Sequence, residues 1–215
     1  MKLYQNGGWY FPDHEEHLIG WLSKVNDKVD GRLRYQGKKQ DEAMKWCKKF
    51  RTAIDVGAHV GLFSYYLAKK FECVIAFEPV MEHRLCFGKN VVANNVILRA
   101  MALGETTGNV SMHTSNGSSG DSWINGDGII PRSRLDDIEY QDVDFIKIDC
   151  EGTELLVLRG AEETIKRCRP CIMVEQKPGH AQRFGLHETG AVDYLKSLGA
   201  TLRAEMSGDF IFSFA

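Results

Sequence analysis

The feature that most constrains the fold is an apolar run that enters a glycine-bearing turn. Run and turn together read Ile54-Asp55-Val56-Gly57-Ala58-His59-Val60-Gly61, and a helix-like pattern follows them. About 20 residues further on, a second apolar run ends at Glu78-Pro79. A strand, a glycine turn, a helix and an acid at the tip of the next strand are typical of a nucleoside-binding α/β unit. The pattern predicts a parallel sheet whose first turn approaches a nucleoside cofactor.

The residue types in this pattern suit such a ligand. Glycine has no Cβ, so Gly57 and Gly61 let the backbone adopt positive φ and pass close to a ligand. The carboxylate of Glu78 can accept hydrogen bonds from both ribose hydroxyls, and each charge-assisted bond contributes about 1.5 to 3 kcal/mol. NAD would satisfy Glu78 equally well, so this acid does not choose the cofactor. The alternative is an ordinary strand-to-helix turn in which Asp55 caps the loop.

From residue 52 onward, short apolar runs alternate with amphipathic stretches, as in a parallel sheet covered by helices on both faces. The predicted strands are residues 52–56, 73–77, 96–101, 144–149, 171–175, 200–205 and 209–214. The predicted helices are residues 61–70, 81–93, 153–167 and 188–198. Only residues 206–208 separate the last two strands, which is too short for a parallel crossover. We therefore expect a doubly wound, mostly parallel sheet that ends in an antiparallel hairpin.

Residues 1–50 differ from the rest of the chain. Leu18, Ile19, Leu22 and Val25 recur at helical spacing, and a second helix is expected at residues 41–50. We interpret residues 1–50 as an N-terminal helical extension packed on the core, and residues 51–215 as the cofactor-binding domain. Residues 114–128 form a polar loop that is long for a compact domain, and such loops are either functional or mobile.

Composition excludes several classes of function. The net charge of −2 offers no excess of positive charge for a phosphate backbone, so we expect no nucleic-acid partner. No apolar run reaches the roughly 18 residues that span a bilayer, so no membrane partner is expected. The first residues lack the apolar core of a secretory signal, which makes a cytoplasmic location the expectation. The six cysteines are expected to be reduced.

A second group of acids follows another predicted strand. Asp149 and Glu151 come directly after Phe145-Ile146-Lys147-Ile148, at the sheet edge where ligands lie in open α/β folds. Either acid could orient an acceptor or take its proton, and helix capping is the equally open structural alternative. Glu175 and His180 follow the next strand at the same edge and are further candidate bases. No ligand spacing indicates a metal site, so none is predicted, but Asp149, Glu151 and Glu175 could converge, which leaves metal assistance open.

Several separated motifs together resemble one known family. The segments are Asp-Val-Gly-Ala-x-x-Gly-x-x-Ser from Asp55, Phe-Glu-Pro at Glu78, Asp-Phe-Ile-Lys-Ile-Asp-x-Glu-Gly-x-Glu from Asp144, and Val-Leu-x-Gly-Ala from Val157. In this order they are similar to the FkbM-type methyltransferases, and the likeness runs from about residue 52 to 212. Residues 1–50 contain no motif that matches.

The resemblance implies a class I, Rossmann-like methyltransferase fold, with S-adenosylmethionine as methyl donor. The implied acceptor is an oxygen of a sugar or another small metabolite. The cofactor-binding residues expected from the motifs and the resemblance are Asp55, Gly57, Ala58, His59, Gly61, Glu78, Pro79, Met101, Ala102 and Asp149. The family commonly has asparagine where this chain has His59.

The catalytic candidates are Asp149 first, Glu151 second and then His180. Two other functions remain open at this point. One is a nicotinamide-dependent oxidoreductase that uses the same strand, turn and Glu78. The other is a non-catalytic nucleoside-binding domain.

Overall fold

A computed structural model describes residues 2–115 and 117–215. Within these residues the central sheet has seven strands in the order β15-β16-β14-β13-β5-β6-β7. Strands β13, β14, β5, β6 and β7 are parallel, and β16 pairs antiparallel with both β14 and β15. Their bounds are β5 (Thr52–Val56), β6 (Cys73–Phe77), β7 (Val96–Arg99), β13 (Val143–Ile148), β14 (Cys171–Glu175), β15 (Thr201–Met206) and β16 (Asp209–Ser213). The expected mostly parallel sheet with a closing hairpin is confirmed.

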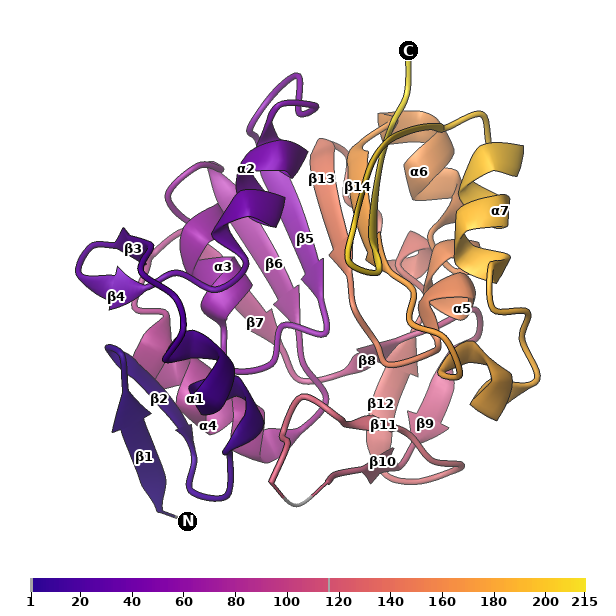
Figure 1. Ribbon diagram of the computed structural model, residues 1–215. Helices are drawn as coiled ribbons and strands as arrows, with labels where there is room; N and C mark the ends of the chain where they lie inside the picture. Colours follow the sequence, from indigo (N-terminus) through magenta and orange to yellow (C-terminus); the bar gives the residue numbers. More distant parts are fainter. Residues whose placement is uncertain (1, 116) are drawn as a thin grey trace.

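Helices cover both faces of this sheet (Figure 1). Their bounds are α3 (Leu62–Leu67), α4 (Met81–Asn90), α5 (Glu154–Arg159), α6 (Glu162–Cys168) and α7 (Gly190–Ser197), with short 3₁₀ helices η1 (Asp136–Ile138) and η2 (Ala181–Phe184). Alternate strand residues point to opposite faces. Ile54 and Ile146 therefore pack in the core beneath α5, α6 and α7, whereas Ala53 and Phe145 pack in the core beneath α3. The sheet is doubly wound.

The single helix expected at residues 153–167 is instead two helices. The break falls at Gly160, which lies against the loop after β8 (Ala102–Leu103), and this approach requires glycine because a Cβ there would lie 1.9 Å from the carbonyl oxygen of Gly104. The carbonyl of Gly160 also accepts a hydrogen bond from the amide of Asp136, at 3.0 Å. The loop that contains Gly104 and the segment that begins at Asp136 thus both contact the chain between the two helices.

Short strands that the sequence did not predict lie beside the main sheet. β12 (Ile130–Ser133) pairs with β8 on one side and with β9 (Gly108–Val110) on the other. β10 (Met112–His113) pairs with β11 (Trp123–Ile124), and β11 falls inside the expected loop at residues 114–128. Residue 116 of that loop lies outside the described residues. The rest of the loop is largely irregular.

The N-terminal region is only partly helical, which corrects the expectation of a helical extension. It contains hairpins β1 (Leu3–Asn6) with β2 (Trp9–Pro12) and β3 (Lys28–Val29) with β4 (Arg32–Leu33), and helices α1 (His17–Leu22) and α2 (Gly37–Met44). The first hairpin forms because Gly7 and Gly8 both adopt positive φ, as the tight turns between twisted strands require. The helix expected at residues 41–50 ends at Met44.

This N-terminal region shares a hydrophobic core with the domain that follows it. Trp9, Phe11 and Leu22 are buried in one cluster with Val60 and Leu62 of the turn and helix after β5. In Figure 1 the central strands point toward the end of the molecule where α1 and the β10–β11 hairpin lie. No helix of the described residues is long and apolar enough to cross a membrane.

Candidate active site

A cleft opens at the carboxyl ends of β5, β6 and β13, between the N-terminal region and the loop after β10. Of the expected site residues, it is lined by Gly57, Ala58, His59, Glu78, Pro79, Met101, Ala102, Asp149 and Glu151. Asp55, Gly61 and His180 are not among its lining residues. The N-terminal region supplies Glu15, His17, Leu18, Trp21 and Tyr35 to the lining, so it forms one side of the cleft.

The two glycines of the turn have different tasks. Gly57 has φ of 76°, and a Cβ there would lie 1.9 Å from the carbonyl oxygen of Asp149, so the ends of β5 and β13 meet only because the residue is glycine. Gly61 begins α3 with φ of 89°, and a Cβ there would come within 2.8 Å of Val91 and Phe87. Gly61 therefore lets the start of α3 approach α4. It lies on the side of the turn that faces away from the cleft.

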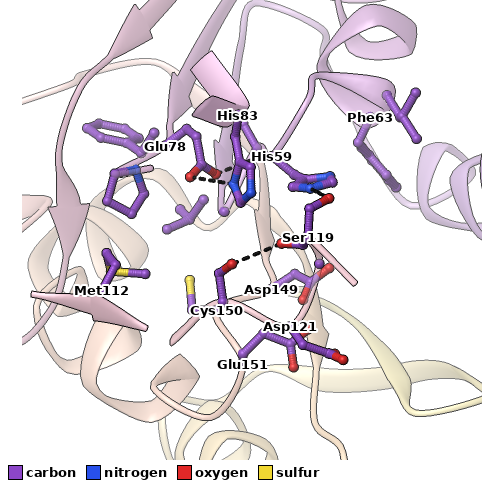
Figure 2. Close-up of a pocket in the computed structure, with 18 of the residues that line it drawn as sticks. His59, Phe63, Glu78, His83, Met112, Ser119, Asp121, Asp149, Cys150 and Glu151 are labelled. Atoms are coloured by element: carbon purple, nitrogen blue, oxygen red, sulfur yellow. Dashed lines mark hydrogen bonds and ion pairs between the residues drawn. The ribbon is translucent and has the colours of Figure 1, made fainter. Parts of the chain in front are cut away.

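Glu78 is held in place by the backbone of its own site (Figure 2). Its Oε2 accepts a hydrogen bond from the His59 amide at 2.7 Å, and its Oε1 accepts one from the Val80 amide at 2.8 Å. The Nδ1 atom of His83 lies 3.2 Å from Oε1. Each oxygen of a carboxylate can accept about two hydrogen bonds, so lone-pair capacity remains for a ligand. We call Gly57, Ala58, His59, Glu78 and Pro79 the Glu78 wall.

A buried lysine, which also lines the cleft, lies between this wall and Asp149. The Nζ atom of Lys147 lies 3.1 Å from the Gly57 carbonyl oxygen, 3.5 Å from Oδ1 of Asp55 and 3.4 Å from Oδ2 of Asp149. Asp55 is fully buried and accepts a hydrogen bond from Ser64 at 2.6 Å. Burial opposes the charge of Lys147, but Asp149 and Asp55 outweigh it and raise the pKa of this lysine. A lysine inside an otherwise apolar strand was a sequence signal that our prediction did not use.

The opposite side of the cleft holds a group of acids, and we call Asp149, Glu151, Glu175 and Lys177 the acid wall. Carboxylate oxygens of its three acids lie within 4.8 Å of one another. The Nζ atom of Lys177 lies 2.7 Å from Glu175 and 3.4 Å from Glu151, so an ammonium group already stands among them. Glu151 and Glu175 are both buried, but only Glu151 and Lys177 line the cleft. Lys177 was assigned no role from the sequence.

The three acids have very different proton affinities. Burial opposes ionisation of Asp149, but Lys147 and Lys177 outweigh it and lower the pKa of Asp149 to about 2. Burial and the charge of Asp149 raise the pKa of Glu151 to about 7. The same two causes raise the pKa of Glu175 to about 10. At neutral pH Asp149 is therefore ionised, Glu175 is protonated, and Glu151 is close to its midpoint.

His180 reaches this acid wall from outside the cleft. Its Nδ1 atom lies 2.8 Å from Oε2 of Glu151. Glu151 has positive φ of 55°, and a Cβ on the next residue, Gly152, would lie 2.5 Å from the His180 carbonyl oxygen. The turn after β13 is therefore packed tightly against the loop after β14. Burial, with Arg183 and Lys177 nearby, lowers the pKa of His180.

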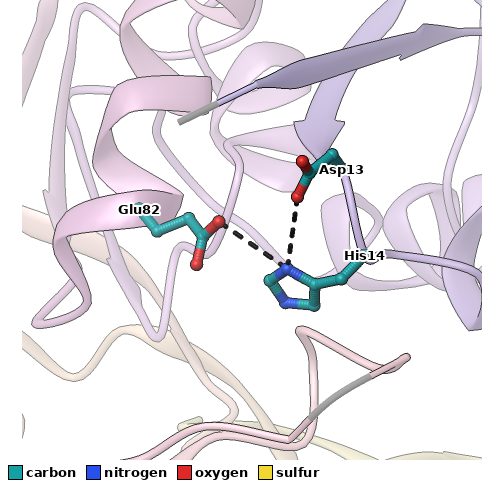
Figure 3. Close-up of side chains that lie close together, drawn as sticks. All are labelled: Asp13, His14 and Glu82. Atoms are coloured by element: carbon teal, nitrogen blue, oxygen red, sulfur yellow. Dashed lines mark ion pairs between the residues drawn. The ribbon is translucent and has the colours of Figure 1, made fainter.

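A third cluster joins the N-terminal region to α4 (Figure 3). The Nδ1 atom of His14 lies 3.8 Å from Asp13 Oδ1 and 3.7 Å from Glu82 Oε1. These exposed contacts link the loop before α1 to the first turn of α4. Surface pairs of this kind contribute at most about 1 kcal/mol, so the cluster adds little to the position of the N-terminal region.

The family model named Methyltransferase FkbM domain matches residues 55–206. The chain belongs to this family. The resemblance found in the motifs is thereby confirmed, and the FkbM assignment covers the strands, turns and acids that form both walls of the cleft. Glu15, Trp21 and Tyr35 line the same cleft but lie before the FkbM domain begins.

Solved structures support the same fold. The FkbM methyltransferase from Methylobacillus flagellatus KT is 21% identical with a TM-score of 0.53, over 77% of this chain and 44% of that protein. The chain thus spans less than half the length of that relative. A precorrin 8W decarboxylase from Methanobacterium thermoautotrophicum is 17% identical with a TM-score of 0.51, over 90% of this chain and 95% of that one.

A third structure has a ligand. This protein from Streptococcus mutans, assigned as a methyltransferase and solved in complex with SAH, is 11% identical with a TM-score of 0.51, over 81% of this chain and 93% of that one. At such identities the likeness shows the fold alone, and the class I, Rossmann-like fold is confirmed. No curated protein matches the chain.

Proposed function

We propose that this chain transfers the methyl group of S-adenosylmethionine to a hydroxyl oxygen of a small molecule such as a sugar. One observation carries the proposal. A single cleft contains a carboxylate suited to a ribose, Glu78, and an acid suited to removing a hydroxyl proton, Glu151. Membership of the FkbM family and the SAH complex of the Streptococcus mutans protein support it.

The residues of the Glu78 wall fit such a cofactor. Oε2 of Glu78 keeps lone-pair capacity for a ribose hydroxyl, while backbone amides and His83 hold the carboxylate in place. Gly57 leaves the backbone beside it without a side chain. Met101, Leu103 and Met112 line the same cleft and offer an apolar surface for an adenine ring. When bound, the cofactor supplies a methyl group that its sulfonium already activates.

The acid wall then has to position the acceptor and take its proton. A general base works best when its pKa lies near the working pH. Glu151, with a pKa of about 7, meets this condition, whereas Asp149 with a pKa of about 2 is a weak base and Glu175 is already protonated. We therefore assign the base to Glu151 and not to Asp149, the first choice from sequence. Asp149 would keep both lysines in place.

His180 lies beside the proposed base. Its Nδ1 atom is 2.8 Å from Oε2 of Glu151, but that oxygen has no hydrogen-bond partner among the described residues, and the His180 side chain is 20% exposed. Because its lowered pKa leaves the imidazole neutral at pH 7, a small rotation of either side chain would let His180 accept a proton from Glu151 and release it to water. On the N-terminal side, Trp21 and Tyr35 form an edge-to-face pair with ring centroids 5.0 Å apart, and their rings offer an acceptor an apolar surface.

Calorimetric titration tests the cofactor assignment. We expect wild-type protein to bind SAH, and Glu78→Ala to weaken binding about tenfold or more. Glu72→Ala is the matched control. Glu72 is an exposed acid that directly precedes the first residue of β6, whereas Glu78 directly follows the last. Thermal melting of both variants checks that they fold. Unchanged SAH affinity in Glu78→Ala would remove this residue from the site.

Two further measurements separate the alternatives. Tighter binding of NADH than of SAH would favour the nicotinamide-dependent oxidoreductase. Incubation with S-adenosylmethionine and a panel of sugars, other alcohols and amines tests for transfer. Methylation of an alcohol supports the proposal, and methylation of amines alone would move it to N-methyl transfer. SAH binding without transfer to any acceptor would favour the non-catalytic domain.

A further inference from the structure

A chain of hydrogen bonds joins three distant segments across the Glu78 wall. The Nε2 atom of His59, in the turn after β5, lies 2.7 Å from Oγ of Ser119. Ser119 belongs to the loop between β10 and β11, and both its hydroxyl and its amide donate to Oε2 of Glu15. Glu15 lies in the loop before α1. Figure 2 shows Ser119 beneath the His59 ring, on the side of Asp149 and Glu151.

The serine and the carboxylate of this chain are both buried. Glu15 is 2% exposed and Ser119 is 1% exposed. The other oxygen of Glu15, Oε1, accepts a hydrogen bond from the Leu18 amide at 2.6 Å. The buried carboxylate is thus satisfied by donors from two segments, and breaking these bonds would leave it unpaired at a cost of about 1 to 3 kcal/mol. Its position is therefore well fixed.

The chain has a direction, because each group has a limited number of protons. A carboxylate only accepts, so the single hydroxyl proton of Ser119 goes to Glu15. Oγ of Ser119 must then accept the hydrogen bond from His59, which requires a proton on Nε2. Burial, with His83 and Lys147 nearby, lowers the pKa of His59 well below its usual range, so the ring is neutral. A neutral ring with a proton on Nε2 has a bare lone pair on Nδ1.

His59 lines the cleft, and among the described residues its Nδ1 has no hydrogen-bond partner. We propose that Glu15 and Ser119 are positioning residues that fix His59 in the Nε2-protonated form and so offer Nδ1 as an acceptor to a donor group of the bound cofactor. This inference rests on the proposed function. It makes the N-terminal region, which lies before the FkbM domain, part of the cofactor site.

A double-mutant cycle tests the coupling. Ser119→Ala should weaken SAH binding about tenfold in the His59 protein, because the ring loses the group that orients it. His59→Asn supplies a fixed amide that needs no tautomer, and asparagine tolerates the φ of 52° at this position. In the His59→Asn background, Ser119→Ala should change the affinity less than about twofold. A purely structural role for Ser119 would give equal losses in both backgrounds and would overturn the inference.

Ser111→Ala is the matched control for this cycle. Ser111 is a serine near the same loop whose hydroxyl donates to the Asp127 carbonyl at 2.9 Å, and it does not line the cleft. We expect its SAH affinity to equal that of the wild type. A loss as large as that of Ser119→Ala would show that any disturbed hydroxyl in this region weakens binding, which would contradict the inference.

The tautomer itself can be measured without any ligand. In ¹⁵N spectra of the ligand-free protein, we expect His59 to show a protonated Nε2 and a bare Nδ1, with the signals assigned by their loss in His59→Asn. Ser119→Ala should shift both resonances toward the average of exchanging tautomers. A proton found on Nδ1 in the wild type would overturn the inference. A wild type that does not bind SAH would refute the proposed function, and the spectra would still decide the tautomer.

Discussion

The two walls of the cleft hold their carboxylates in different ways. On the Glu78 wall, backbone amides of His59 and Val80 donate directly to the carboxylate, so its geometry is built into the turn. On the acid wall, the three acids face one another, and the ammonium group of Lys177 stands among them. The Glu78 carboxylate thus has a position fixed by backbone hydrogen bonds. The acids of the acid wall interact electrostatically, so their pKa values differ widely.

Lys147 connects the two walls, since its ammonium contacts Asp55 and the Gly57 carbonyl on one side and Asp149 on the other. We therefore expect different effects when Lys147 is replaced, when Glu151 or Glu175 is replaced, and when the pH is changed.

The largest effect is expected for Lys147→Met, which removes the ammonium group that contacts both walls. It leaves the carboxylates of Asp55 and Asp149 without their shared counter-charge, and breaking a buried pair in this way costs about 3 to 5 kcal/mol. Urea denaturation measures the loss in the free energy of unfolding. The matched control is Lys166→Met, an exposed lysine paired with Glu162 on α6, which should lose less than about 1 kcal/mol. Equal losses in the two variants would show that the walls are held independently.

The next effect separates the members of the acid wall. Glu151→Gln should lower kcat about 100-fold, because a general base contributes at least that much, while SAH affinity stays unchanged. Glu175→Gln should change kcat only a few-fold, because glutamine resembles the protonated acid that a pKa of about 10 maintains at neutral pH. Steady-state kinetics of the methyl transfer compares the two variants. A larger loss in Glu175→Gln than in Glu151→Gln would reverse their roles.

The smallest effect concerns pH. In the proposed mechanism the ionised form of Glu151 is the active one, and the pKa of Glu151 is raised to about 7. The rate should therefore fall about tenfold per unit as pH drops below 7, and it should level off above that pH. SAH affinity, which depends on the Glu78 wall, should change little over the same range. Kinetics between pH 5 and pH 9 checks the slope, and a profile that stays the same in Glu151→Gln would place the titrating group elsewhere.

Sequence reasoning succeeded where a structural feature depends on local patterns. The core strands β5, β6 and β14 were predicted with their observed bounds, because each is a short apolar run bounded by turn residues. The final hairpin followed from a connection too short for any other topology. The Glu78 wall was also predictable, since the glycine turn and the following acid have a recognisable spacing.

The remaining features depend on contacts between distant segments. Strands as short as β8 and β10 contain two residues each and show no periodicity, so only their partners define them. The N-terminal hairpins were missed although Gly7-Gly8 is a turn signal, because the apolar spacing of the following helix dominated the prediction. Glu15 meets Ser119 across 104 residues of sequence. The choice of Glu151 over Asp149 needed the positions of two lysines.

The core shared by Trp9, Phe11 and Leu22 with Val60 and Leu62 has a practical consequence for protein engineering. A truncated version that starts at the FkbM domain boundary would expose the apolar faces of Val60 and Leu62 to water. It would also leave the cleft without one side. Such a fragment should be prone to aggregation, and swapping domains between relatives should preserve the N-terminal region together with the turn that it covers.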